Sequence, residues 1–262
     1  MIVADVPPTA AMPSAGHACV RLRAYGGPSA TVGTIYCLPA AGGSAPFFRS
    51  WPMLLPSGVA LRAVQLPGRQ DLSDVPVFTD MAALASSVAD AVAQDAGRMP
   101  FVLFGHSMGA LTAFETTREL RRRGGPQPLL LALSGYPAPH LPSPLPALHT
   151  LPDDELLARV HALGGIPDEV MRNPELLKLS LPALRADFAL LASYRYVGEP
   201  PLASPLAVFG GLEDALVQRP DLRAWHQHSA SDVAFDQFSG GHFFLTRWSS
   251  RILSEICTHF GR

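Results

Sequence analysis

The sequence contains little charge, and the charges that it has nearly cancel. Only 16% of its 262 residues are charged, and 20 basic and 22 acidic side chains give a formal net charge of −2. Lysine occurs once, as Lys178. No nucleic-acid or membrane partner is expected, because such partners are bound by a strong positive field or a dense basic patch. The densest basic run, residues 121–123 before a glycine pair, instead predicts the last turn of a helix, where cations complement the helix dipole.

Cysteine is also scarce, and long apolar runs are absent. The three cysteines, Cys19, Cys37 and Cys257, are an odd number with neither a metal-binding spacing nor a disulfide framework. Residues 1–8 lack the basic start and apolar core of a signal peptide, and no uncharged apolar stretch reaches the roughly 18 residues that span a membrane. These absences predict a protein of the reducing cytoplasm, which we expect to be a monomer.

Proline and apolar residues, by contrast, are abundant. The chain has 26 prolines and is 48% hydrophobic, a fraction that excludes disorder over its whole length because disordered chains are poor in apolar residues. Its length allows one large α/β domain or two small ones. Residues 1–30 are rich in Pro, Ala and Gly without periodicity, and we expect them to form a loose leader.

After residue 30, short apolar runs alternate with amphipathic helical patterns. This alternation predicts the α/β class, with a mostly parallel central sheet and helices on both of its faces. The predicted strands span 34–38, 59–66, 101–104, 129–133, 206–209 and 233–238, and the predicted helices span 81–93, 108–123, 222–228 and 247–260.

One long segment interrupts this alternation. Prolines crowd residues 137–152, which excludes the interior of a strand or helix there, and the residues that follow are helical without a strand. We therefore predict a sheet core of residues 31–140 and 201–262 that carries a helical lid inserted at 141–200. Because proline-rich connectors bound the lid on both sides, we expect it to move relative to the core.

A pentapeptide near the middle of the chain carries the strongest chemical signal. Gly105-His106-Ser107-Met108-Gly109 lies between a predicted strand and a predicted helix, the context in which Gly-x-Ser-x-Gly forms a nucleophile elbow. The turn is so tight that the two flanking positions leave no room for a Cβ atom. The serine hydroxyl then projects above the sheet at a helix N-terminus, which favours a developing anion. Ser107 is therefore predicted to be a catalytic nucleophile.

A serine nucleophile needs a general base and an acid, which follow it on this fold in the order Ser, acid, His. His242 lies in a glycine-rich loop after the last predicted strand, where the base is expected. Asp214 and its neighbour Glu213 follow the preceding strand and a glycine-rich turn. Either carboxylate would reach the carboxyl edge of the sheet, so position alone leaves both open as the acid.

Two backbone N–H groups are expected to form an oxyanion hole. One comes from the residue after the serine, Met108, and the other from the glycine-rich loop 39–44 after the first predicted strand. Gly42 and Gly43 would let that loop approach the reacting group closely.

Six segments between about residues 34 and 250 resemble, in the expected order, the type II thioesterases of polyketide and nonribosomal peptide assembly lines. The segments are Pro-Ala-Ala-Gly-Gly-Ser (39–44), Val-Gln-Leu-Pro-Gly-Arg (64–69), Gly-His-Ser-Met-Gly (105–109), Leu-Gly-Gly-Ile-Pro (163–167), Leu-Pro-Ala-Leu-Arg-Ala-Asp-Phe (181–188) and Phe-Ser-Gly-Gly-His-Phe-Phe-Leu (238–245).

The resemblance implies an α/β-hydrolase fold whose catalytic triad is Ser107, Asp214 and His242, with the N–H groups of Ala41 and Met108 as oxyanion donors. It also implies the reaction, which is hydrolysis of acyl groups from the phosphopantetheine arm of an acyl or peptidyl carrier protein. By this reasoning the protein has no cofactor of its own, because the substrate carries the phosphopantetheine. A carrier-protein domain of a synthase is the expected partner.

Two positions depart from the family pattern. Ala40 stands where the family usually has His, and Tyr136 stands in Ser-Gly-Tyr where the family usually has Ser-Gly-Arg. Ala40 leaves the N–H of Ala41 in place but removes a side chain that could brace the loop.

Two other functions stay open. A small-molecule carboxylesterase or lipase would use the same triad, which does not by itself distinguish an oxyester from a thioester. A catalytically silent module that binds carrier proteins would keep the fold without the reaction.

Overall fold

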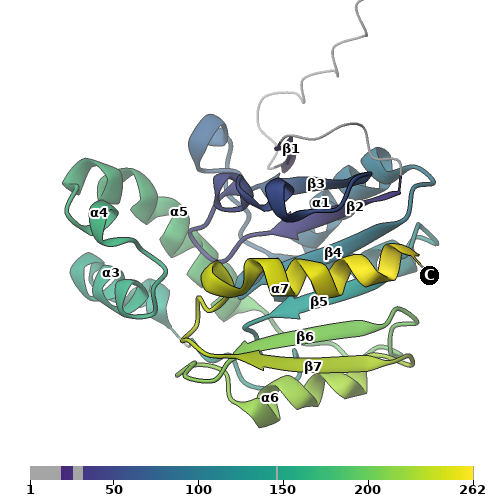
Figure 1. The fold of residues 1–262 in the computed structure, drawn as a ribbon. Helices are drawn as coiled ribbons and strands as arrows, with labels where there is room; N and C mark the ends of the chain where they lie inside the picture. The colour runs from purple at the N-terminus through teal and green to yellow at the C-terminus, as the bar shows by residue number, and fades with distance from the viewer. Residues whose placement is uncertain (1–18, 26–31, 146, 262) are drawn as a thin grey trace, which may run out of the picture.

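The computed structural model describes residues 19–25, 32–145 and 147–261, and within these ranges the chain forms one seven-stranded sheet (Figure 1). The strand order is β1-β3-β2-β4-β5-β6-β7, and all neighbouring pairs are parallel except β1 and β3. The prediction of a mostly parallel sheet is confirmed. The strands are β1 (Arg21–Ala24), β2 (Gly33–Leu38), β3 (Val59–Gln65), β4 (Phe101–His106), β5 (Leu130–Ser134), β6 (Leu206–Gly211) and β7 (Val233–Phe238).

The expectation of a loose leader over residues 1–30 is wrong at β1. This edge strand pairs antiparallel with β3, and Leu22 lies opposite Val64. Its four residues alternate charged and apolar side chains, a pattern too short to signal a strand by itself. Residues 1–18 and 26–30 of the expected leader lie outside the described residues.

Helices cover both faces of the sheet, as predicted. Tyr36 of β2 packs with the apolar cluster on one face, and its neighbour Ile35 packs with the cluster on the other. A strand of a parallel sheet is apolar throughout because both of its faces are buried. The first face is covered by α1 (Met81–Ala96), α2 (Met108–Arg122), α6 (Arg219–Arg223) and η5 (Ala224–His228), and the second by η1 (Ala45–Phe48), η2 (Trp51–Leu54), α7 (Leu245–Cys257) and η6 (Thr258–Gly261).

Three helices lie together beyond one end of the sheet, the end from which α7 starts (Figure 1). They are α3 (Asp153–Ala162), α4 (Asp168–Met171) and α5 (Pro174–Ser193), and they form the helical stretch predicted after the prolines. The division of the chain into a core and a movable lid stays a prediction. None of the helices in the described ranges is both long and apolar enough to cross a bilayer.

The longest of these helices, α5, contains a proline in its interior. Pro182 has no N–H to donate to the preceding turn, and its ring crowds the carbonyl four residues earlier. On its N-terminal side Leu179 is 73% exposed and Lys178 is exposed. On its C-terminal side Leu184 is 3% and Leu191 2% exposed. The proline therefore marks the point where α5 changes from a surface helix to a core helix.

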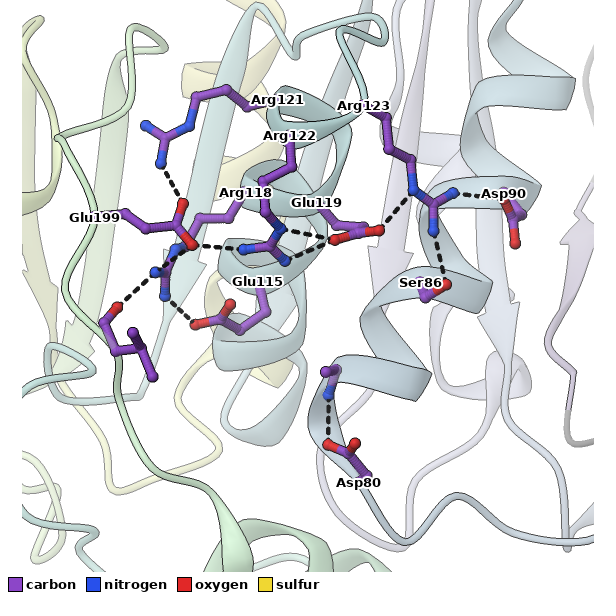
Figure 2. A network of polar contacts seen from close by, with 12 residues as sticks. Asp80, Ser86, Asp90, Glu115, Arg118, Glu119, Arg121, Arg122, Arg123 and Glu199 are labelled. Carbon is purple, nitrogen blue, oxygen red and sulfur yellow. Dashed lines mark hydrogen bonds and ion pairs between the residues drawn. The ribbon is translucent and has the colours of Figure 1, made fainter.

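The arginine run before the glycine pair ends α2, as predicted, and its side chains form a network with acidic residues (Figure 2). Glu199, in the segment that follows α5, accepts hydrogen bonds from Arg121 and Arg122 at 2.6 Å and lies 2.7 Å from Arg118. Burial alone would raise the pKa of Glu199, but the hydrogen bonds from Arg121 and Arg118 lower it to about 2. The network attaches the exit of the helical segment to the core helix α2.

Candidate active site

The nucleophile elbow predicted from the sequence is present at the junction of β4 and α2. Ser107 has φ 53, in the left-handed region that non-glycine residues rarely adopt. A Cβ on Gly105 would lie 2.0 Å from the carbonyl oxygen of Gly109, and a Cβ on Gly109 would lie 2.2 Å from that of Leu38. The glycines are therefore required for the turn, which holds the serine at the start of a helix with its backbone strained.

A chain of hydrogen bonds joins the three side chains predicted as the triad. The Oγ atom of Ser107 lies 3.0 Å from Nε2 of His242, and Nδ1 of the same ring lies 2.8 Å from Oδ2 of Asp214. The three residues are 6%, 5% and 2% exposed, respectively. With Nδ1–H donating to the carboxylate, Nε2 carries the lone pair that accepts the serine proton. The geometry therefore suits nucleophilic catalysis.

The choice between Asp214 and Glu213 follows from the directions of their side chains. Asp214 faces His242, and its other carboxylate oxygen accepts from the N–H of Leu216 at 2.9 Å. The carboxylate of Glu213 turns to the loop that carries the histidine and accepts from the N–H of Gly240. Asp214 is thus the carboxylate that reaches the imidazole, and Glu213 connects the two loops.

The loop 39–44 forms a tight turn at the end of β2, directly against the start of α2. Gly42 has φ 71, and the N–H of Gly43 donates to the carbonyl of Ala40 at 2.9 Å, the pattern of a type II turn. In the part of the chain that the structure describes, the N–H groups of Ala41 and Met108 donate to no protein atom. Both predicted oxyanion donors are therefore free to bind a substrate oxygen.

His106, to which the sequence motif assigned no role of its own, packs beside His242. Its Nδ1 lies 2.9 Å from Oγ of Ser134, and its ring centroid lies 5.1 Å from that of His242. Burial, with a smaller effect from the charge of His242, holds the pKa of His106 well below its usual value. It is therefore a neutral ring against which the catalytic imidazole candidate packs. A Cβ on Gly135 (φ 63) would lie 2.8 Å from the His106 ring, so a glycine is required there.

The two departures from the family pattern lie in different surroundings. Tyr136 is 5% exposed, burial raises its pKa to about 12, and its carbonyl accepts from the indole N–H of Trp225 at 2.8 Å. Ala40 instead lines an apolar cavity of about 200 Å³ beside the turn. The small side chain at position 40 leaves space in that cavity. Its lining comprises Pro39, Ala40, Ala41, Gly43, Phe47, Phe48, His106, Gly164, Gly165, Pro167, Phe243 and Thr246.

Comparisons with known proteins identify the family of the chain. The family described as "Thioesterase domain" matches residues 33–262. The chain is 39% identical to linear gramicidin dehydrogenase LgrE of Brevibacillus parabrevis, over 82% of this chain and 83% of that protein. It is 36% identical to thioesterase PikA5 of Streptomyces venezuelae, over 86% of this chain and 80% of that protein.

A solved structure extends the likeness to the whole fold. The type II thioesterase BorB from the borrelidin biosynthetic cluster superposes with a TM-score of 0.83 at 35% identity, over 91% of this chain and 97% of that chain. The chain therefore belongs to the thioesterase family, and within it to the type II thioesterases of polyketide and nonribosomal peptide biosynthesis.

Proposed function

We propose that this chain is a serine thioesterase that hydrolyses acyl groups from the phosphopantetheine arm of acyl or peptidyl carrier proteins, with Ser107, His242 and Asp214 as its catalytic triad. The biological outcome would be editing or release of stalled or mis-loaded intermediates. The observation that carries the proposal is the buried hydrogen-bonded chain from Ser107 through His242 to Asp214 in a member of the thioesterase family.

In the first half of the reaction, Oγ of Ser107 forms a bond to the acyl carbonyl carbon while its proton passes to Nε2 of His242. The carbonyl oxygen becomes an oxyanion that accepts hydrogen bonds from the N–H groups of Ala41 and Met108. Collapse of this intermediate breaks the C–S bond, and the imidazolium returns its proton to the departing thiolate. Asp214 holds the imidazole in the required tautomer and stabilises its charged form.

In the second half, water attacks the acyl group on Ser107. His242 takes a proton from the water as the new C–O bond forms and then gives it to Oγ as the ester bond breaks. The products are the free acid and the regenerated serine. The overall reaction consumes only the thioester and one water molecule.

The cavity beside Ala40 supports a short acyl chain as the substrate. It is apolar, it adjoins the turn that bears Ala41, and its volume of about 200 Å³ is smaller than the ~300–1,000 Å³ of pockets that enclose larger ligands. We place the first carbons of the acyl chain in this cavity. A cytoplasmic, monomeric enzyme acting on carrier domains completes the proposal, and light scattering of the purified chain tests the monomer.

The test is Ser107→Ala assayed by intact-mass kinetics on acyl-loaded carrier proteins of increasing chain length. We expect kcat/KM to fall at least ~1,000-fold, because the nucleophile is lost while binding remains. Ser73→Ala, at an exposed serine, is the matched control and should behave as the native chain. A Ser107→Ala protein with native turnover would overturn the proposal and favour the silent binding module.

The carboxylesterase alternative needs a different comparison. The native enzyme should have a higher kcat/KM for the acyl carrier protein than for a p-nitrophenyl ester of the same acid. A preference for the oxyester would replace the thioesterase proposal by a small-molecule esterase.

A further inference from the structure

A carboxylate on α5 reaches across to the turn that carries one of the proposed oxyanion donors. Asp187 is 5% exposed, and its Oδ2 accepts a hydrogen bond from the N–H of Gly42 at 2.7 Å. Leu184, three residues earlier on the same face of the helix, packs on the same glycine: a Cβ there would lie 2.5 Å from its Cδ1. The second half of α5 therefore contacts the turn through both a hydrogen bond and an apolar side chain.

Arg69, which follows β3 by four residues, completes this contact. Arg69 donates two hydrogen bonds to Asp187, from Nη1 to Oδ2 at 2.6 Å and from Nη2 to Oδ1 at 2.8 Å. Nη1 also donates to the carbonyl of Gly43 at 3.0 Å, and Nε donates to the carbonyl of Pro67 at 3.1 Å. Arg69 is 8% exposed, so the pair is buried and its charges face each other. The pair thus holds two consecutive residues of the turn, one by its N–H and one by its C=O.

The conformation of the turn determines where the N–H of Ala41 points. The carbonyl of Ala40 and the N–H of Ala41 belong to one planar peptide group and point in opposite directions. That carbonyl accepts from the N–H of Gly43, so the N–H of Ala41 is directed away from the inside of the turn. The turn depends on Gly42, which also adopts other backbone conformations readily. Asp187 and Arg69 hold Gly42 and Gly43 in the conformation that keeps the Ala41 N–H outward.

The energetics also favour a positioning role over a stabilising one. A buried ion pair contributes little net stability, because desolvation of the two charges offsets their attraction. An oxyanion donor, however, must be fixed before the reaction, since its contribution depends on being aimed at the developing charge. A rigid bidentate pair next to such a donor supplies that fixed orientation.

We propose that Asp187 and Arg69 are positioning residues that set the oxyanion hole, so that hydrolysis requires the second half of α5 to be seated on the turn. The inference rests on the proposed function, because it takes Ala41 as an oxyanion donor. In this proposal α5 fixes the position of an oxyanion donor in addition to covering the site.

The test compares Asp187→Ala, Asp187→Asn and Arg69→Lys with the control Asp153→Asn. Asp153 forms an exposed ion pair with Arg185, which lies on α5 two residues before Asp187, so the control breaks an ion pair of the same helix that does not touch the turn. Each variant is assayed for kcat and KM on an acyl carrier protein. Its affinity for an alkylboronic acid is also measured. Boron binds Oγ of Ser107 as the serine proton passes to His242, and the resulting tetrahedral anion places an oxygen in the oxyanion hole.

We expect Asp187→Ala to lower kcat by roughly 10- to 100-fold, less than the ~100- to 1,000-fold loss of a whole donor, with KM within about two-fold of native. Boronic acid affinity should fall in parallel with kcat. Asp187→Asn and Arg69→Lys, which keep part of the hydrogen bonding, should lose about five- to ten-fold, and Asp153→Asn less than about two-fold.

Thermal unfolding establishes that each variant is folded, and if Asp187→Ala is not, Asp187→Asn and Arg69→Lys decide the test. Folded variants with native kcat and native boronic acid affinity would overturn the inference. Ser107→Ala separates this failure from that of the proposed function. If Ser107→Ala is inactive while the Asp187 and Arg69 variants are native, only the positioning role fails, whereas an active Ser107→Ala protein removes the proposed function itself.

Discussion

The two halves of α5 are one helix in sequence but lie in opposite environments. Before Pro182, the apolar side chains of Leu176 and Leu179 are exposed to 43% and 73%. After it, Leu184 and Asp187 are buried against the turn that carries Ala41. A lid over an active site must move, but a residue that aims an oxyanion donor must not. If the predicted lid moves, we expect the first half of α5 to move with it and the second half to stay fixed against the turn, with Pro182 between the two.

The largest expected difference is in stability, between variants that shorten one leucine in each half of α5 to alanine. Leu191→Ala should lower the free energy of unfolding by about 2–5 kcal/mol, because it leaves a cavity at a side chain that is only 2% exposed. Leu179→Ala should change it by less than about 0.5 kcal/mol, because that side chain already contacts water. Urea titrations of both variants measure the difference. Equal losses would show that the two halves are equally packed.

Replacement of Pro182, the residue that divides the two halves, should have a smaller effect on the free energy of unfolding. Pro182→Ala restores an N–H that can donate within the helix and removes the ring that crowds it, so we expect a gain of about 1 kcal/mol in unfolding free energy. Hydrogen exchange should slow at the amides of residues 175–181. Pro174→Ala is the control, because proline at the first helical position breaks no hydrogen bond. Unchanged exchange in Pro182→Ala would argue against the proline as the boundary.

A pH-dependent effect is expected in the segment that follows the second half. The ring of His228 lies 5.4 Å from that of Tyr196 in this segment, and its Nε2 lies 2.7 Å from Nδ1 of His140. Burial, followed by the charges of His140, Arg118 and His226, lowers the pKa of His228 to about 4. Between pH 6.5 and 4 the unfolded chain binds the proton more readily than the folded chain does, so stability should fall as pH falls through this window.

His228→Gln should flatten that dependence. The loss of unfolding free energy between about pH 7 and pH 4.5, measured by urea titration at each pH, should be smaller in the variant than in the native chain. An identical pH dependence in both proteins would exclude His228 as its source.

Much of the fold and of the candidate site could be predicted because the signals are local. Apolar runs and helical periodicity placed strands β2 to β7 and helices α1 and α2, and the motif around Ser107 contains its own strand, turn and helix. His242 was predictable from a glycine-rich loop at one point of the chain. Asp214 and Glu213 are adjacent and chemically alike, so only the direction of each side chain in the fold distinguishes them.

The parts that escaped prediction depend on contacts between distant residues. Arg69 and Asp187 are far apart in the sequence. Each lies in a segment that resembles the family, but nothing local indicates that the two side chains pair across the turn at Gly42. The strand β1 exists because β3 offers it an edge, which four alternating residues do not indicate. His106 could be interpreted only as part of the motif, although its ring supports that of His242.

The exposed half of α5 also makes the protein easy to label at one place. Lys178 is the only lysine in the sequence and lies on that half, so it carries the only ε-amino group of the chain. Once the more acidic α-amino group has been acylated near neutral pH, an amine-reactive dye would place a fluorophore on one known side chain without any engineered cysteine. With a quencher on the arm of a carrier protein, the intensity of that dye would report whether the carrier approaches this half of α5.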